Sequence, residues 1–253
     1  MTVETVYIGI DPTGGSRPIT YAVLDRDLNI RELADIDMDA LLDAVEAYPA
    51  AVCGIDAPSS RNQRLLMNPT YRAGVGLEPD RDNYAGYRVC EYELRRRGIY
   101  VYNTPVEEEK IADWMLEGWR LYDRLQAAGF VNYPANGPRR LFETYPYAIF
   151  TVLAGSRPYS KMGLEGLLQR QLILYEEGLD LPDPMRVTEE ITRHHLRTGQ
   201  INLENLKSHD QLDALAAAFT AWAVDHTSQS IVAVGDPAEG QIVLPVAALS
   251  DSY

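Results

Sequence analysis

Two short apolar segments that end alike constrain this fold most. One reads Val-Tyr-Ile-Gly-Ile-Asp-Pro and carries Asp11, and the other reads Ala-Val-Cys-Gly-Ile-Asp-Ala-Pro and carries Asp56. Each is predicted to be a buried strand, because an apolar run of this length is closed by a proline, which cannot continue strand pairing. Side chains alternate along a strand, so Asp11 shares a face with Gly9, and Asp56 shares a face with Gly54. Each strand therefore presents bare backbone beside its terminal carboxylate.

A late segment, residues 208–224, is predicted to be a helix that packs on this bare surface. Ser208 or His209 can begin the helix, and a run rich in alanine and leucine continues it. Asp210 and Asp213 are three positions apart and therefore project from the same side. Because alanine side chains are small, the helix can lie close to the strands and bring both carboxylates to the strand ends.

Four carboxylates in one place repel each other, so a protein keeps them charged only with cations nearby. Oxygen ligands suit Mg²⁺ or Mn²⁺, and the predicted metal ligands are Asp11, Asp56, Asp210 and Asp213. Two such ions about 4 Å apart can activate water and stabilise a leaving oxygen in phosphodiester hydrolysis. His209 could assist proton transfer or bind phosphate, or it could simply cap the helix or pair with a nearby acid. Any single Asp-Pro pair could instead close a turn.

The remaining pattern predicts one α/β domain over residues 1–253, with insertions around residues 59–83 and 130–138. Three antiparallel strands are predicted within the first 34 residues, and a helix near residues 39–47 leads to the strand of Asp56. Further predicted elements are helix 84–97, strand 100–103, helix 107–128, strand 139–146, helices 147–153, 163–177 and 188–197, and a terminal edge hairpin of strands 230–234 and 241–245.

Other chemically useful side chains are scattered through the chain. Glu143 is a third acid near a proline-closed strand end, so it can join the catalytic site, although such glutamates more often serve only as surface or hydrogen-bonding residues. The candidate substrate-binding residues are Lys161, Arg61, Arg95 and Arg139. Arg95 has a simpler interpretation, because basic residues suit the C-terminal end of a helix.

The net charge of −14 is unusual for a nucleic-acid-binding protein. A nucleic-acid substrate would require a local basic surface, built from the candidates above together with Arg64, Arg72 and Arg96. Cys53 and Cys90 are expected to be buried thiols. No run approaches the roughly 20 apolar residues that cross a membrane, so a cytoplasmic protein without a membrane partner is expected.

Several short motifs together resemble the domain-of-unknown-function 429 family of predicted RNase H-like nucleases. They are Gly9-Ile10-Asp11, Gly54-Ile55-Asp56-Ala57-Pro58, Arg88-Val89-Cys90-Glu91 running into Arg95, Glu143-Thr144-Tyr145-Pro146, Ser160-Lys161 and His209-Asp210-Gln211-Leu212-Asp213-Ala214. The last motif is also distantly similar to the final-helix motif of Holliday-junction resolvases. The resemblance implies a mixed five-stranded RNase H-like sheet, its first three strands antiparallel, with helices on both faces. It also implies that Asp11, Asp56, Asp210 and Asp213 carry the metal ions.

The leading expectation is therefore a metal-dependent nuclease. A hydrolase of a small nucleotide or phosphoester is the first alternative, because a small substrate needs no extended basic surface. A non-catalytic module that binds nucleotide or nucleic acid on the same fold is the second alternative. The sequence leaves the oligomeric state open, with a homodimer among the options.

Overall fold

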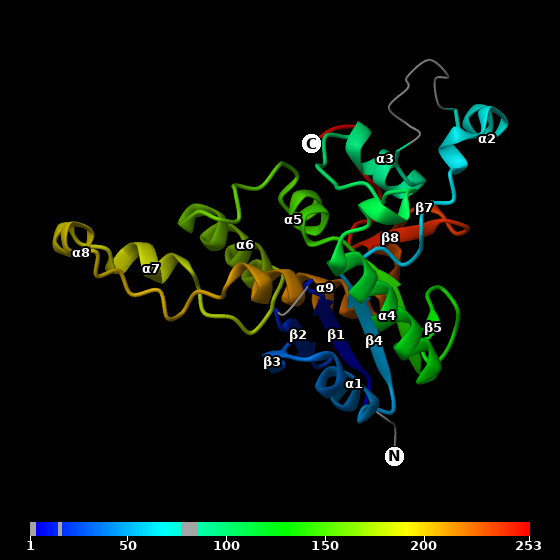
Figure 1. Cartoon of the computed structure of the whole chain (residues 1–253). Coiled ribbons are helices and arrows are strands. Elements are labelled where there is room, and N and C mark those ends of the chain that lie inside the picture. The colour runs from blue at the N-terminus through cyan, green and yellow to red at the C-terminus, as the bar shows by residue number, and fades with distance from the viewer. Residues whose placement is uncertain (1–3, 15–16, 77–85) are drawn as a thin grey trace.

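The computed structural model describes residues 4–14, 17–76 and 86–253. They contain one open mixed sheet of eight strands in the order β3-β2-β1-β4-β6-β8-β7, with β5 paired to β6 (Figure 1). The strands are β1 (Val6–Asp11), β2 (Ile19–Leu24), β3 (Ile30–Ile36), β4 (Ala51–Ile55), β5 (Val131–Asn132), β6 (Arg139–Glu143), β7 (Val232–Asp236) and β8 (Gly240–Leu244). Strands β1, β4, β6 and β8 are parallel, whereas β1, β2 and β3 form the predicted antiparallel meander.

The sheet is wider than the five strands expected. The terminal hairpin of β7 and β8 lies at the edge as predicted, but it continues the sheet through pairing of Glu143 with Ile242. The short β5 pairs with β6 within the predicted insertion of residues 130–138. The sheet therefore extends past the meander and the two Gly-Ile-Asp strands.

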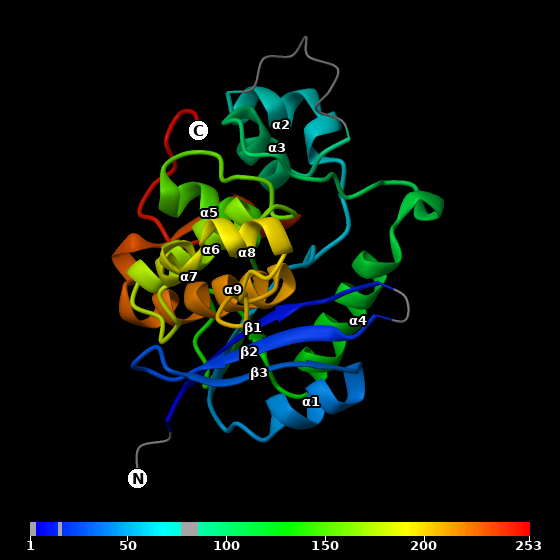
Figure 2. The ribbon, with the colours of Figure 1, turned by 90° about the vertical axis from the view of Figure 1, so that its left-hand side faces the viewer.

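The helices are α1 (Met38–Glu46), α2 (Pro69–Gly74), α3 (Val89–Arg96), α4 (Asp113–Ala127), α5 (Pro146–Ala154), α6 (Leu164–Glu176), α7 (Met185–Glu190), α8 (Arg193–Thr198) and α9 (His209–His226). Helices α5, α6 and α9 cover one face of the sheet, and α1 and α4 cover the other (Figure 2). Each face has its own hydrophobic core. Among the described residues, no helix is both long and apolar enough to cross a bilayer.

Three local predictions were wrong. Residues 100–103 form no strand, because side chains bind this backbone: Arg95 donates to the Val101 carbonyl, and the Thr104 amide donates to Glu91. The expected helix 107–128 starts only at Asp113, after extended backbone at residues 111 and 112. The expected helix 188–197 is divided, since the Thr192 hydroxyl caps a new helix.

Two predicted segments extend beyond the described residues. The insertion at 59–83 contains a 3₁₀ turn (Leu65–Met67) and α2, and its residues 77–83 lie outside them. The helix expected at 84–97 begins at Val89, and its first two positions also lie outside the described part.

Helix α9 packs directly on the backbone of the two Gly-Ile-Asp strands, as predicted. A Cβ atom on Gly9 would lie 1.9 Å from the carbonyl oxygen of Ala214, and one on Gly54 would lie 2.7 Å from that of Ala217. Both distances are shorter than any real carbon contact, so only glycine permits this approach. The close packing fixes where α9 delivers its acidic side chains.

Candidate active site

Two aspartates occupy neighbouring positions at the carboxyl ends of β1 and β4. Asp11 ends β1, and Asp56 directly follows β4. The Asp56 amide donates a hydrogen bond of 2.9 Å to the Ile10 carbonyl, which continues the parallel register by one residue. Adjacent strands lie about 4.8 Å apart, so the two acids leave the same edge of the sheet side by side.

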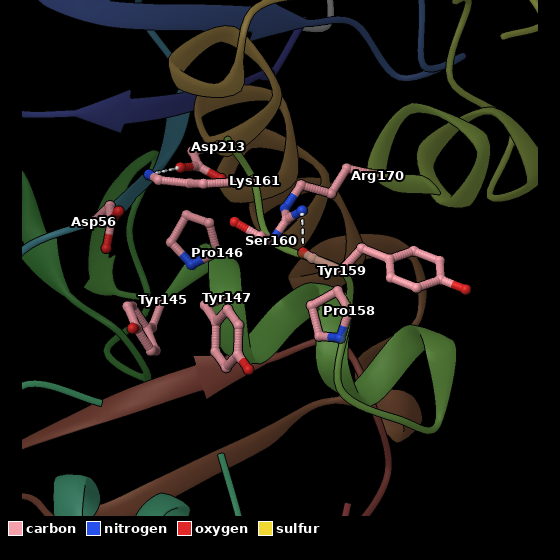
Figure 3. Close-up of a pocket in the computed structure, with 10 residues that line it drawn as sticks. All are labelled: Asp56, Tyr145, Pro146, Tyr147, Pro158, Tyr159, Ser160, Lys161, Arg170 and Asp213. Carbon is pink, nitrogen blue, oxygen red and sulfur yellow. Dashed lines mark hydrogen bonds and ion pairs between the residues drawn. The ribbon is translucent and has the colours of Figure 1, made fainter. Parts of the chain in front are cut away.

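Helix α9 adds a third aspartate to this edge. Asp213 is 4% exposed and lies one residue before Ala214, the position that rests on Gly9. Its Oδ2 accepts a hydrogen bond of 2.8 Å from the Nζ of Lys161, which comes from the loop between α5 and α6 (Figure 3). The structure therefore brings together Asp11, Asp56, Asp213 and Lys161, all of which the sequence singled out.

The three aspartates destabilise each other's charged forms. Burial, together with the negative charges of Asp213 and Asp210, raises the pKa of Asp11 to about 8, against the opposing charge of Lys161. Burial, followed by the charges of Asp11 and Asp213, holds the pKa of Asp56 well above its usual value. The pKa of Asp213 is also raised by burial, although Lys161 opposes the rise. One lysine does not supply enough positive charge for three carboxylates.

Asp210 and His209 lie at the start of α9 beside this cluster. Ser208 caps the helix through the amide of Gln211, which confirms the expected start. The Nδ1 atom of His209 is 2.8 Å from the Oδ1 of Asp210, and both side chains are about one-third exposed. His209 is thus the partner of a nearby acid, one of its expected roles, while a role in proton transfer stays a prediction.

Glu143 lies at the same sheet edge, but other groups bind its carboxylate. Arg88 donates to both oxygens, at 2.5 Å and 2.9 Å, and the amide and hydroxyl of Ser59 donate to Oε2. Arg88 is fully buried and also pairs with Glu91. Glu143 therefore holds a buried ion-pair network in this structure and is not free to bind a metal ion.

This network also contains residues that the sequence did not single out for a role. The carboxylate of Glu239 accepts from the amides of Gln63 and Val89, and its carbonyl accepts from Ser60 and Arg88. The network joins the loop after β4, α3, β6 and the terminal hairpin. The sequence signal for this buried network was Arg88, an arginine within the otherwise apolar start of a predicted helix.

Of the four predicted substrate-binding residues, only Lys161 lines the pocket beside the aspartates. Arg61 pairs with Glu108 and stacks on Trp119. Arg95 stacks on tyrosine rings and donates to a carbonyl. Arg139 is misplaced by the prediction: it begins β6, about 13 Å along the strand from Glu143, and its guanidinium donates to three backbone carbonyls.

A cavity of about 330 Å³ opens beside the aspartates. Its walls are Asp56, Tyr145, Pro146, Tyr147, Pro158, Tyr159, Ser160, Lys161, Arg170 and Asp213 (Figure 3). Lys161 contacts Asp213 at 2.8 Å, whereas Arg170 lies on the side of the cavity away from Asp56, so a polar ligand in the cavity can meet both acids and cations. Arg170 is not among the candidate residues predicted from the sequence.

The donor chemistry of the cluster suits a hard divalent ion, but the arrangement is incomplete. Oδ1 of Asp56 is buried and has no hydrogen-bond partner within the described residues. Such an oxygen beside the carboxylates of Asp11 and Asp213 is the kind of ligand that Mg²⁺ and Mn²⁺ take. In residues 4–14, 17–76 and 86–253, however, no three His, Cys, Asp or Glu side chains are arranged to hold a metal ion. Metal binding thus requires side-chain rotation.

The chain was compared with known protein families. A model described as "Protein of unknown function (DUF429)" matches residues 9–239. The chain belongs to this DUF429 family. The matched region of the DUF429 protein begins at Gly9 and ends at Glu239, so it contains the aspartate cluster, Lys161 and the whole Arg88 network. A search of curated proteins finds no match.

Proposed function

We propose that this DUF429 protein is a divalent-metal-dependent hydrolase of phosphodiester bonds. The convergence of Asp11, Asp56 and Asp213 from β1, β4 and α9 is the observation that carries the proposal. Their raised pKa values indicate a deficit of positive charge that bound metal ions would fill. The strand order β3-β2-β1-β4-β6, with a helix packed on β1, supports an RNase H-like core.

Asp11 and Asp56 would hold Mg²⁺ or Mn²⁺, with Asp213 and Asp210 completing a two-ion site. When bound, such ions activate water and stabilise the leaving oxygen of the phosphodiester. Lys161 balances the charge of Asp213 at 2.8 Å and leaves N–H groups for a phosphate oxygen. His209, which contacts Asp210 at the start of α9, would assist proton transfer.

The substrate is a nucleic acid or a small nucleotide or phosphoester. The placement of the arginines favours the small substrate over an extended nucleic acid. Arg61 and Arg96 are neutralised by glutamates, and Arg139 lies at the far end of β6. An extended strand would need a continuous basic surface, which these residues do not supply.

A hydrolysis panel tests this function. Wild-type protein is incubated with Mg²⁺ or Mn²⁺ and with single-stranded and structured nucleic acids, nucleotides and small phosphodiesters. Asp11→Asn should abolish hydrolysis, whereas Asp27→Asn, an exposed acid in the β2–β3 turn, should leave it unchanged. Metal binding without hydrolysis of any substrate would favour a non-catalytic module instead.

A further inference from the structure

Arg170 is a buried guanidinium group that forms no ion pair at contact distance within the part of the chain that the structure describes. It is 2% exposed, and its Nη1 donates to the carbonyls of Tyr159 and Gly166 at 2.9 and 3.1 Å. Its Nη2 and Nε atoms have no acceptor among the described residues. Arg88 is equally buried, but it binds two carboxylates. Asp213 is the anion that acts on the charge of Arg170, but Lys161 already binds its carboxylate, so a further anion in the cavity would stabilise both cations.

The local packing places a second cation beside Arg170. A Cβ atom on Gly166 would lie 1.9 Å from the carbonyl oxygen of Ser160, so the loop carrying Ser160 and Lys161 presses on the first turn of α6. This contact fixes Lys161 and Arg170 in the wall of the same 330 Å³ cavity. In Figure 3 the Ser160 side chain lies between them.

The donors in this wall match the oxygens of a phosphate group. Lys161 uses one of its three N–H groups on Asp213, and its side chain is 45% exposed. Ser160 adds a hydroxyl group, and Arg170 adds N–H groups for which residues 4–14, 17–76 and 86–253 supply no acceptor. Asp213 contacts the Nζ of Lys161, and Asp56 lies on the side of the cavity away from Arg170, so Asp56 would face the part of the ligand beyond the phosphate (Figure 3).

We propose that the Lys161–Arg170 pocket binds a terminal phosphate group of the substrate, next to the bond that the aspartate cluster hydrolyses. A phosphomonoester carries a charge of about −1.5 to −2 at neutral pH, which matches two cations better than a bridging phosphodiester does. The cavity volume is near the lower end of ligand pockets, which suits a phosphate with one attached sugar. The position of the cut bond rests on the proposed function, whereas phosphate binding does not.

Binding of inorganic phosphate to the metal-free full-length protein tests the pocket. We expect saturable binding by calorimetry in EDTA at constant ionic strength. Lys161→Met and Arg170→Lys should each weaken it by about tenfold, the effect of losing a charged hydrogen bond. Lys110→Met, an exposed lysine outside the cavity, should bind as wild type. Melting temperatures identify any variant that fails to fold. Because the Lys161 side chain is half-exposed, Lys161→Met should fold, and it tests the pocket even if Arg170→Lys unfolds.

Competition identifies the source of the phosphate. A nucleoside monophosphate and a terminally phosphorylated oligonucleotide should compete with phosphate, whereas the matching nucleoside and hydroxyl-ended oligonucleotide should not. Absence of saturable phosphate binding, or unchanged binding in folded Lys161→Met, would overturn the pocket. Phosphate binding in a protein that hydrolyses nothing would overturn the proposed function alone.

Discussion

The substitution Gly9→Ala tests the packing on which the site depends. Its new Cβ would lie 1.9 Å from the carbonyl oxygen of Ala214 and 2.3 Å from the amide nitrogen of Ala218. Both atoms are helix backbone, so no side chain can rotate out of the way. Because ordinary contact begins near 3.4 Å, β1 and α9 must separate locally by about 1.5 Å.

We expect this separation to lower the free energy of unfolding by about 3 kcal/mol or more, because two rigid elements must move apart. This loss is at or above the upper end of the range typical of overpacked cores. For a chain of this size, about 3 kcal/mol corresponds to a melting temperature lowered by roughly 6–12 °C. Urea denaturation and thermal melting measure both quantities. The same movement displaces Asp213 from the β1 edge, so hydrolysis should also fall.

Two further glycines provide controls for this prediction. Gly54→Ala, whose Cβ would meet Ala217 at 2.7 Å, should destabilise less than Gly9→Ala. Gly74→Ala should be neutral or slightly stabilising, because it lies in α2 with no atom within 4 Å of the added carbon. A Gly9→Ala variant within about 1 kcal/mol of wild type, the typical effect of a point substitution, would refute the close packing of α9 on β1.

Three other predictions concern the acids. The pKa of Asp11 is raised to about 8, so between about pH 4 and pH 8 the folded protein keeps a proton that the unfolded chain loses. The free energy of unfolding of the metal-free protein should therefore have its full value below about pH 4 and fall as pH rises to about 8. Denaturation in EDTA from pH 5 to 9 measures this fall. Asp11→Asn should flatten the dependence of stability on pH and raise stability at pH 8. An unchanged slope of stability against pH in Asp11→Asn would contradict the prediction. Mn²⁺ or Mg²⁺ should raise the melting temperature, because bound ions relieve the repulsion, and a calorimetric titration without binding at millimolar metal would exclude the site. Asp213→Asn should be nearly inactive in the hydrolysis panel, whereas Glu143→Gln should lose less activity. Glu143→Gln should instead lower the free energy of unfolding by about 3–5 kcal/mol, because it leaves Arg88 without one buried partner. If Glu143→Gln loses more activity than Asp213→Asn, the metal site must lie at Glu143.

Local patterns predicted the elements that carry the acidic cluster. Glycine beside the acid in two strands, and alanine beside the acid in a late helix, were sufficient to predict the contact of α9 with β1 and β4. The start of α9 followed from a capping serine. In each case the physical cause lies within a few residues of the chain, so the sequence alone contains it.

The buried charge networks could not be predicted in this way. The sequence left open whether Glu143 joins the catalytic site or serves as a hydrogen-bonding residue, because its partners Ser59 and Arg88 come from segments far away in the chain. The position of Arg170 depends on a loop that only the packing of Gly166 fixes. The placement of Arg139 was foreseeable, because parallel strands with acids at their carboxyl ends must place their first residues at the opposite edge.

The packing of α9 on β1 also sets the order in which this chain can mature during synthesis. Strand β1 leaves the ribosome first, yet the helix that covers Gly9 begins only at His209. Until then, the backbone of β1 at Gly9 lacks the helix that packs on it, and contacts of such long sequence separation form slowly. A chain that ends before α9 therefore carries Asp11 and Asp56 without Asp213. The aspartate cluster can therefore form only in chains that extend past α9, because Asp213 lies in that helix.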